Sequence, residues 1–534
     1  MDTQVLVVGA GPCGVTIANL LGVYGVRTIL IDRAPDVIDY PRGVGVDDES
    51  LRVFQACGLG KQVHADMVQN QALIWFDSNR TKIAEVAPAG QPFGWPRRNS
   101  FLQPMLEKTM RGGLSRFPHV ELRTETELLD LTQDASGVRA TITGPDGKQE
   151  ILDASYVIGA DGGKSTVRKL MGSSLEGHTL AARWLVVDIK GSTYHAPFSG
   201  NYISSDRPHV SIDLPYGYRR FEFRLRDDET DEQMMQPAAV ERLIRSHFDW
   251  TGPMPGLERT RIYSHHSRVA NRFGNGRIFI AGDAAHLQPP WFGQGMNSGI
   301  RDAANIAWKI AAVLEHGADG SILQTYDTER RGHAQAMVEL ATTLGRIYSP
   351  KNKFGERVRS VGLRALQYLP GARDYLLQMK FKPMPYYEKG IVLNPDPREP
   401  IGRMVIQPHV ETETGERVPL DTALGDWFAV VGINVDPAEH LSEESLNYWK
   451  SLGAGIFRIN RSRAGEHMRR VRPGTVLLDD VAGGFRDWTA RRTDREILVI
   501  RPDRYLAAMS SRDAADAMTS GFAELLPVRA TVNH

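Results

Sequence analysis

The sequence predicts an α/β protein of several domains, with a Rossmann-type unit first, an inserted β-sheet segment, and a small α/β domain last. Three observations predict this fold class. The β-branched run Gln4–Val8 leads into a glycine-rich turn and an apolar helical pattern. Short alternating strands gather between residues 176 and 270, and after a proline-rich stretch strands alternate again with helices. The 534 residues are enough for roughly two to four domains.

The first unit is a strand, a turn, a helix and a second strand. Its turn, Gly9–Gly14, has the spacing G-x-G-x-x-G, and the second strand ends at Asp32. Such glycines allow a tight turn and close approach of the backbone to a pyrophosphate, while the acid accepts from a ribose hydroxyl. The pattern predicts a dinucleotide site and leaves NAD and FAD both open, and the alternative is a glycine-rich turn without a ligand. The candidate residues are Gly9, Gly11, Pro12, Gly14, Asp32 and Arg33.

Two later strands also end in an acid and glycines. The first runs through Ala154–Gly162 and carries Asp161, and the second runs through Arg277–Ala281 into Gly282 and Asp283. Open α/β sheets bind ligands beyond the carboxyl ends of their strands, although Asp283 could instead cap a helix. The loop that follows contains Gly293, Gly295, Met296 and Asn297 and leads into a long helical pattern. The positive end of that helix dipole would stabilise an anion.

The three motifs in this order resemble the FAD-dependent group A aromatic hydroxylases, the p-hydroxybenzoate hydroxylase fold, over about the first 345 residues. The resemblance implies bound FAD, with Asp283 on the ribityl hydroxyls and the loop Gly293–Asn297 at the flavin ring. It also implies that Arg42 lies near the ribityl phosphate and that Gln103 contacts FAD at a helix start. Asp161 would belong to the segment between FAD and the pyridine nucleotide. Arg42 and Gln103 could also be ordinary surface residues, and Asp161 a strand-end cap.

The resemblance further implies the reaction. NADH, with NADPH left open, reduces FAD, and the reduced flavin and O2 hydroxylate a phenol through a flavin C4a-hydroperoxide. The chain has no second G-x-G-x-x-G unit, as the family's transient use of the pyridine nucleotide implies. Three residues are candidates for catalysis: His286, Pro289 and Arg220. A structural, hydrogen-bonded histidine is an equally good interpretation of His286.

The middle segment has the pattern of a sheet laid over the flavin. Strand-like runs occur at residues 184–189, 209–214 and 220–225, with a turn at Pro215–Gly217. The candidate substrate residues are His209, Tyr218 and Arg220, because such side chains can bind a carboxylate or a phenol. Trp291 joins them from the loop that faces the ring. Each of these could instead be a solvated residue of the sheet.

The predicted domains follow from these segments. They are an FAD-binding domain (1–175, with some substrate-domain strands around 70–100, continued at 271–350), a substrate sheet (176–270), a helical segment with a linker (351–400) and a C-terminal domain (401–534). The last domain resembles the thioredoxin-like domain of longer phenol hydroxylases and includes a strand-like run, Ile497–Tyr505. Without a cysteine pair it cannot perform dithiol chemistry, so we expect a role in packing or in dimer contacts.

Stretches such as 47–52, 295–303, 381–385 and 501–504 extend the resemblance nearly end to end. They are similar to the bacterial subfamily that hydroxylates 3-(3-hydroxyphenyl)propionate and 3-hydroxycinnamate, which implies ortho-hydroxylation of a phenolic acid. Asp32, where many relatives have Glu, and Trp291–Phe292 depart from the pattern. The alternatives are a related hydroxylase of another phenol or a polyketide, and a flavoprotein without hydroxylating activity.

Composition limits the partners. The 64 Lys and Arg residues balance 64 Asp and Glu residues, so the chain lacks the basic excess expected for nucleic-acid binding. No apolar stretch approaches about 18 residues, and two cysteines are too few for a disulfide framework or a Cys-based zinc site. We therefore expect a cytoplasmic protein without metal, membrane or nucleic acid, and a homodimer stays open.

Overall fold

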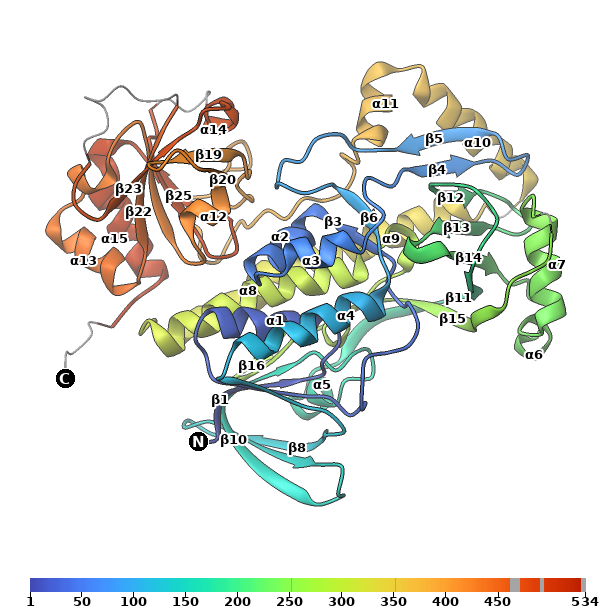
Figure 1. Ribbon diagram of the computed structural model, residues 1–534, viewed down its shortest axis with the longest axis horizontal. Coiled ribbons are helices and arrows are strands. Elements are labelled where there is room, and N and C mark those ends of the chain that lie inside the picture. Colours follow the sequence, from blue (N-terminus) through green and yellow to red (C-terminus); the bar gives the residue numbers. More distant parts are fainter. Residues whose placement is uncertain (251, 351, 462–470, 490–493, 530–534) are drawn as a thin grey trace.

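The computed structural model of the protein describes residues 1–250, 252–350, 352–461, 471–489 and 494–529 (Figure 1). Within these ranges the strands form three large sheets and one two-stranded ribbon. Helices cover the sheets and join them: α1 (Pro12–Val23), α2 (Asp48–Ala56), α3 (Gly60–Ala65), α4 (Gln103–Gly112), α5 (Thr166–Leu170), α6 (Asp231–Met234), α7 (Pro237–His247), α8 (Gly295–Glu315), α9 (Thr325–Tyr348), α10 (Lys353–Gln367), α11 (Pro370–Leu377), α12 (Leu420–Leu424), α13 (Glu443–Ser451), α14 (Gly484–Thr489) and α15 (Ala515–Leu525). The predicted α/β fold class is confirmed.

The first sheet has a parallel centre. Its order is β16 (Gly274–Asn275), β17 (Ile278–Ile280), β10 (Gln149–Gly159), β1 (Thr3–Val8), β2 (Thr28–Ile31) and β7 (Val120–Arg123), and the pair β8 (Glu127–Gln133) and β9 (Val138–Thr143) extends β10. Strands β17, β10, β1, β2 and β7 run parallel. Their apolar runs are buried because helices cover the sheet. The carboxyl ends of β1, β2, β10 and β17 therefore meet at one edge.

Helix α8 packs along α1 above this sheet (Figure 1). Its close approach depends on small residues: a Cβ added at Gly299 of α8 would lie 2.9 Å from the Cα of Gly282, next to Cys13 of α1. Most of the inward face of α8 is buried apolar surface, including Trp308. The helix thus fixes its own N-terminus at the carboxyl edge of the parallel strands.

The second sheet is antiparallel for most of its width. Its order is β18 (His286–Leu287), β15 (Leu257–Ala270), β11 (Leu175–Lys190), β14 (Tyr218–Arg224), β13 (His209–Asp213), β12 (Ser199–Tyr202), β4 (Leu73–Phe76) and β5 (Lys82–Val86). Strands β4 and β5 thus join this sheet from the region around residue 80. Helix α7 covers one face through Val240 and Ile244, while β4 and β5 lie near α10 and α11 (Figure 1).

A short ribbon lies between the two sheets. Strand β3 (Gly45–Asp47) pairs antiparallel with β6 (Arg98–Ser100), so that Asp47 lies opposite Arg98. Asp47 also caps α2, because its carboxylate accepts a hydrogen bond from the backbone N–H of Ser50 at 2.9 Å. The ribbon therefore holds the segment after β2 against the segment before α4.

The C-terminal part is built on a mixed sheet. Its order is β20 (Arg417–Pro419), β19 (His409–Thr412), β23 (Thr475–Asp479), β22 (Gly455–Asn460), β21 (Ala429–Ile433), β24 (Ile497–Ile500) and β25 (Leu506–Ser510). The expectation of one strand over Ile497–Tyr505 is wrong. β24 ends at Ile500, Arg504 adopts a left-handed φ of 67°, and β25 returns antiparallel to β24. Pro502 lies in this turn, where its missing N–H costs no sheet hydrogen bond.

The C-terminal part shares its core with the first sheet. The ring of Phe428 meets Trp308 of α8 edge-on at 5.3 Å, and Trp427 meets Tyr24 at 5.2 Å. A buried ion pair adds to this contact, since both nitrogens at the end of the Arg501 guanidinium lie 2.8 Å from the Glu329 carboxylate of α9. The two parts thus pack as one body across an apolar surface.

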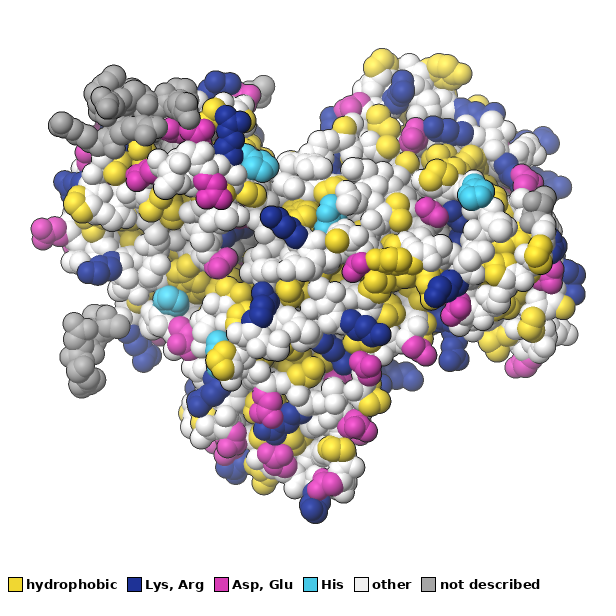
Figure 2. Space-filling model, in the orientation of Figure 1, with side chains coloured by type: hydrophobic (Ala, Val, Ile, Leu, Met, Phe, Trp, Pro, Cys, Tyr) yellow, Lys and Arg dark blue, Asp and Glu magenta, His cyan; other side chains and the backbone are white. Residues whose placement is uncertain are grey.

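Acidic and basic side chains alternate over the visible face of the molecule without a single-sign field (Figure 2), in keeping with the zero formal net charge. Among the described residues, no helix is both long enough and apolar enough to cross a bilayer.

Candidate functional site

The glycine-rich turn lies at the carboxyl edge of the parallel sheet. Gly9 has a φ of +99°, and a Cβ there would lie 2.6 Å from the carbonyl oxygen of Ala160. A Cβ at Gly14 would lie 1.8 Å from the carbonyl oxygen of Gly9. Both glycines are therefore required by packing within the chain. Gly11 differs, because nothing lies within 4 Å of its added Cβ, and no side chain caps the N-terminus of α1 behind it.

Asp32 stands at the end of β2 beside this turn. Its carboxylate accepts hydrogen bonds from the backbone N–H groups of Ala10 (2.6 Å) and Ala34 (2.8 Å). Arg111 of α4, which the sequence analysis missed, donates to the carbonyl of Ala10 and lies 3.9 Å from Asp32. Arg33 is exposed and does not line the cavity described below.

Arg42 and Gln103 hold the segment between β2 and β3. Arg42 lies 3.6 Å from Asp283, and both side chains remain about half exposed. The side-chain oxygen of Gln103 accepts a hydrogen bond from the backbone N–H of Gly43 at 2.6 Å, while its amide donates to Glu107. The structure thus brings Arg42, Gln103 and Asp283 together from three distant segments.

Asn297 joins the loop before α8 to the ribbon. Its side-chain amide donates to the carbonyl oxygens of Gly293 (2.7 Å) and Gly45 (3.1 Å). Its side-chain oxygen accepts from the backbone N–H of Asp47 and from the Ser50 hydroxyl. The two bonds accepted by the Asn297 oxygen are buried, and the two donated by its amide are partly buried. Gly293 takes the left-handed φ of +64° that glycine tolerates best. No side chain caps the N-terminus of α8.

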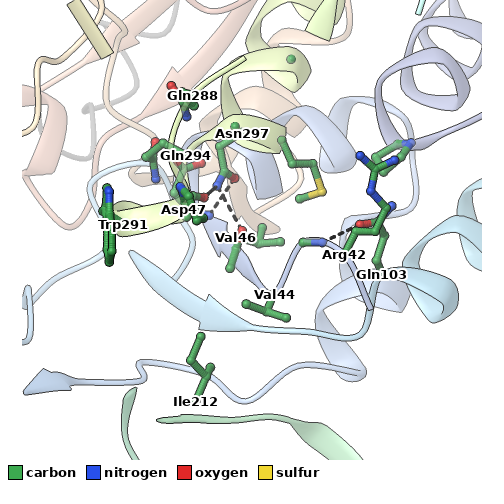
Figure 3. A pocket seen from close by; sticks show the side chains of 18 of the residues that line it. Arg42, Val44, Val46, Asp47, Gln103, Ile212, Gln288, Trp291, Gln294 and Asn297 are labelled. Carbon is green, nitrogen blue, oxygen red and sulfur yellow. Dashed lines mark hydrogen bonds between the residues drawn. The ribbon is translucent and has the colours of Figure 1, made fainter. Parts of the chain in front are cut away.

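One cavity of about 390 Å³ connects these groups with the second sheet. Figure 3 shows Arg42 and Gln103 at one end and Trp291 at the other. The residues that line it include Gly11, Pro12, Cys13, Arg42, Gly43, Gly45, Gln103, Gly282, Asp283, Gly293, Gly295, Met296, Asn297, Leu73, Asn201, Val210, Ile212, Arg220, Glu222, Arg97, Arg98, Gln288, Pro290 and Trp291. The lining thus combines apolar, amide and charged side chains, and this combination suits an amphipathic ligand.

Strand alternation decides which sheet residues reach the cavity. On β13, Val210 and Ile212 line it, so His209 points to the opposite face, where its ring stacks on Tyr202 at 4.5 Å. Tyr218 lies at the start of β14 and outside the lining, next to the Lys190 ammonium. The structure therefore does not bring the predicted substrate residues His209 and Tyr218 to the cavity. It does bring Trp291 there.

Arg220 lines the cavity with most of its donors engaged. Its guanidinium forms two hydrogen bonds with Asp188, at 2.8 and 2.9 Å. It also donates to the backbone carbonyls of Pro41 and Arg42. This arginine therefore fixes the segment that carries Arg42.

His286 and Asp161 lie behind the cavity wall. The His286 ring is 1% exposed and contacts the Asp302 carboxylate at 2.7 Å. Burial alone would raise the pKa of Asp302, but His286 and Arg330 hold it well below the usual range. Asp161 accepts hydrogen bonds from the backbone N–H groups at the start of α5. Neither residue lines the cavity, and neither does Pro289, although Pro290 does.

A cluster of buried acids and cations adjoins the ribbon, and Asp47 of this cluster lines the cavity. Asp47 and Glu49 share Lys382, whose ammonium lies 2.8 and 2.7 Å from their carboxylates, and Arg301 of α8 lies 3.0 Å from Asp47. Burial alone would raise the pKa of Asp47, but Lys382 and Arg301 lower it well below its usual range. For Asp48, burial prevails and raises the pKa to about 7. Lys382 and Arg301 lie next to Asp47 of the cavity wall, and the spacing of motifs in the sequence does not indicate this.

Comparisons with known proteins agree with this geometry. A model of FAD binding domains matches residues 2–341. The 3-(3-hydroxy-phenyl)propionate/3-hydroxycinnamic acid hydroxylase 2 of Burkholderia vietnamiensis is 42% identical, across 98% of this chain and 97% of the relative. The chain belongs to the family of FAD-dependent aromatic hydroxylases. A 3-(3-hydroxy-phenyl)propionate/3-hydroxycinnamic acid hydroxylase from a Mycobacterium species is 43% identical across 98% of this hydroxylase and 92% of the relative.

Solved structures share the fold of this hydroxylase. The flavin-dependent monooxygenase PieE, in complex with FAD and substrate, superposes with a TM-score of 0.81 at 20% identity, covering 98% of this chain and 99% of PieE. Aklavinone-11 hydroxylase superposes with a TM-score of 0.78 at 23% identity and similar coverage. A model of the HcaD C-terminal domain matches residues 402–525.

The donor set of this hydroxylase fits FAD. The uncapped N-terminus of α1 and the open space beside Gly11 suit a pyrophosphate. Asp32 suits a ribose hydroxyl, and the half-exposed Asp283 suits further hydroxyls along the same cavity. The uncapped N-terminus of α8 offers unpaired N–H groups to an anionic ring edge.

Proposed function

We propose that this hydroxylase converts a phenolic acid, 3-(3-hydroxyphenyl)propionate or 3-hydroxycinnamate, into its 2,3-dihydroxyphenyl product. The balanced reaction consumes the phenol, NADH, a proton and O2, and yields the catechol, NAD⁺ and water. One oxygen atom of O2 becomes bonded to the ring carbon ortho to the hydroxyl, where a hydroxyl group replaces hydrogen. The other oxygen atom is reduced to water by the two electrons that NADH supplies. The names of relatives at 42 and 43% identity support this substrate class.

One observation carries the proposal. A single cavity runs from the glycine-rich turn at Gly11 to the sheet residues Val210 and Ile212. A cofactor held at the turn and a substrate held against the sheet would therefore share one space. Sharing one space would keep the reacting groups in contact.

The residues proposed to hold FAD are those that the site brings to the edge of the parallel sheet. They are Gly9, Gly11, Pro12, Gly14, Asp32, Arg42, Gln103, Gly282, Asp283, Gly293, Gly295, Met296 and Asn297. When bound, FAD supplies the redox chemistry that activates O2 for transfer to an aromatic ring.

The sheet side of the cavity is proposed to hold the aromatic ring. Leu73, Val210, Ile212 and Trp291 offer apolar contacts, and the backbone at Pro290 completes the wall. Glu222 of β14 also lines the cavity, and burial raises the pKa of its carboxyl. A carboxylate with a raised pKa is a suitable acceptor for the proton of a phenol.

His286 and Arg220 are proposed as positioning residues. The buried pair of His286 and Asp302 lies between β18 and α8, and Asp302 also accepts from the backbone N–H of Gly282 at 3.1 Å. Arg220 holds the backbone of Pro41 and Arg42. Both residues would act by holding cavity segments in place.

The decisive experiment measures NADH consumption by the purified, FAD-loaded enzyme with and without 3-(3-hydroxyphenyl)propionate, together with product analysis. We expect strong stimulation and one catechol formed per NADH oxidised. Stimulation that yields only hydrogen peroxide would make the compound an effector and direct the search to other phenols or polyketides. NADH oxidation that yields no hydroxylated product with any phenol tested would point to a flavoprotein without hydroxylating activity.

A further inference from the structure

Arg98 is a cavity residue with a guanidinium donor that no described residue accepts. It lies on β6, opposite Asp47 of β3, and lines both the central cavity and a neighbouring hollow formed with residues 87–91. One nitrogen at the end of its guanidinium, Nη1, is shielded from solvent and has no hydrogen-bond partner. Burial lowers the pKa of Arg98 to about 10, so the side chain still carries its charge at neutral pH.

The other arginines that line the cavity are engaged. Arg220 is paired with Asp188 and with two carbonyls. Arg42 is paired with Asp283 near the surface, and Arg97 donates to the carbonyl of Gln378 at 3.1 Å. Within the described ranges, no carboxylate lies within ion-pair distance of Arg98, and the titratable side chain that acts on its pKa is the neutral phenol of Tyr348.

The polar side chains near Arg98 are bonded to other residues and do not serve as its acceptor. The Gln71 amide donates to the carbonyl of Asp213 and to Ser100, while its oxygen accepts from Ser199. The acids that line the cavity have other partners: Glu222 lies 3.9 Å from Arg220, Asp47 binds Lys382 and Arg301, and Asp283 lies near Arg42. A shielded guanidinium nitrogen without an acceptor is costly, and a ligand carboxylate would supply the missing acceptor through two parallel hydrogen bonds.

We propose that Arg98 is the specificity-determining residue that binds the side-chain carboxylate of the phenolic acid. The inference rests on the proposed function for the phenol and deepens it by naming the group that selects acids over neutral phenols. The apolar lining at Leu73, Ile212 and Trp291 then contacts the ring and the carbon chain. The cation and the apolar wall together would orient the substrate within the cavity.

The test compares an acid with its neutral isostere. Dissociation constants for 3-(3-hydroxyphenyl)propionate and 3-(3-hydroxyphenyl)propanamide are measured from the change in flavin absorbance, for the FAD-loaded wild type, Arg98→Gln and Arg98→Lys. We expect the wild type to bind the acid about 10- to 100-fold more tightly than the amide, as a charge-assisted bidentate pair would give. Arg98→Gln should remove this preference while leaving amide affinity nearly unchanged, and Arg98→Lys should restore part of it.

Arg346→Gln, at an exposed arginine near the end of α9, is the matched control and should keep the wild-type preference. FAD content and melting temperature establish that each variant is folded, and Arg98→Lys retains the charge if Arg98→Gln does not hold flavin. Equal losses for acid and amide in Arg98→Gln, or a wild type without acid preference, would overturn the inference. A wild type that prefers the acid but forms no catechol would instead contradict the proposed function alone.

Discussion

The side-chain oxygen of Asn297 accepts a hydrogen bond from the backbone N–H of Asp47 at 3.1 Å, across 250 positions of sequence. The same amide group donates to Gly45 and Gly293. Asn297 therefore ties the β3 ribbon to the start of α8, so the two loops on either side of the cavity form a single unit.

Asn297→Ala should loosen this unit. The substitution leaves the carbonyls of Gly45 and Gly293 and the N–H of Asp47 without their partners, and each unmet buried group costs about 1–3 kcal/mol. We expect a free energy of unfolding lower by about 2–4 kcal/mol and weaker FAD binding, measured by urea unfolding and by fluorescence titration of the apoprotein. Unchanged FAD affinity would show that the bond network does not shape the cofactor site.

Two glycines of one turn should respond differently to alanine. At Gly11 the added methyl meets no protein atom, so Gly11→Ala should leave the melting temperature of the apoprotein unchanged. Because Gly11 lines the cavity, the methyl should nevertheless weaken FAD binding by about tenfold or more. At Gly14 the methyl would collide with the carbonyl of Gly9, so Gly14→Ala should destabilise the apoprotein itself by about 1–3 kcal/mol.

Both variants are compared by thermal unfolding without FAD and by titration with FAD. Wild-type FAD affinity in Gly11→Ala would contradict the placement of the pyrophosphate. Wild-type stability of the Gly14→Ala apoprotein would contradict the packing of the turn.

Glu329 should make stability depend on acid pH. Its carboxylate is fully buried with Arg501 and Lys309. Burial alone would raise the pKa of Glu329, but these two cations lower it to about 2. Because the carboxyl pKa is lower in the folded state, Glu329 stabilises the fold at every pH above its pKa in the unfolded chain, about 4.3. That stabilisation is lost as the pH falls toward 2. The contribution at pH 7 is roughly 3 kcal/mol.

Glu329→Gln should therefore lower the free energy of unfolding by about 3–5 kcal/mol at pH 7, because buried Lys309 loses its ion pair and Arg501 keeps only Asp503. Urea unfolding at several pH values should show this gap narrowing only below about pH 4.5. Glu339→Gln, at an exposed position of the same helix, should change stability by less than about 0.5 kcal/mol. A gap that narrows already between pH 8 and 6 would assign the effect to other groups.

Gly345 of α9 should control the position of Trp291. A Cβ at Gly345 would lie 2.4 Å from the indole nitrogen of Trp291. The indole is packed edge-on against Trp184 at 4.6 Å, so the open direction for its movement is the cavity. Gly345→Ala should raise the KM for the phenolic substrate and destabilise the protein by about 1–3 kcal/mol.

The matched control is Gly332→Ala in the same helix, where nothing lies within 4 Å of the added Cβ. This change should leave KM unaltered and stabilise the helix by up to about 1 kcal/mol. Steady-state kinetics and thermal unfolding distinguish the two variants. An unchanged KM in Gly345→Ala would mean that Trp291 does not contact the substrate.

The sequence analysis predicted the parts of the site that depend on local spacing. Gly9, Gly14 and Asp32 belong to one strand–turn–helix–strand unit, and Asp283 follows a buried strand directly. Parallel strands bring their carboxyl ends to one edge whatever the rest of the chain does. For this reason the cofactor edge could be predicted from motifs alone.

Side-chain roles in the inserted sheet were harder to predict. Arginines and histidines on alternating strands look alike in sequence, but a shift of one residue moves a side chain to the opposite face. His209 thus stacks on Tyr202 away from the cavity, while its neighbour Val210 lines it. Similarly, the burial of His286 against Asp302 depends on where α8 crosses the sheet.

By itself, the sequence determined the α/β fold class and the membership of the hydroxylase family, because these depend on short motifs in a fixed order. Only the tertiary structure decided that Arg98 faces the cavity without a partner and that Asn297 joins two loops. The physical reason is the pairing of β3 with β6. A strand pair between distant segments has a register set by the packing around it, and no local pattern carries that information.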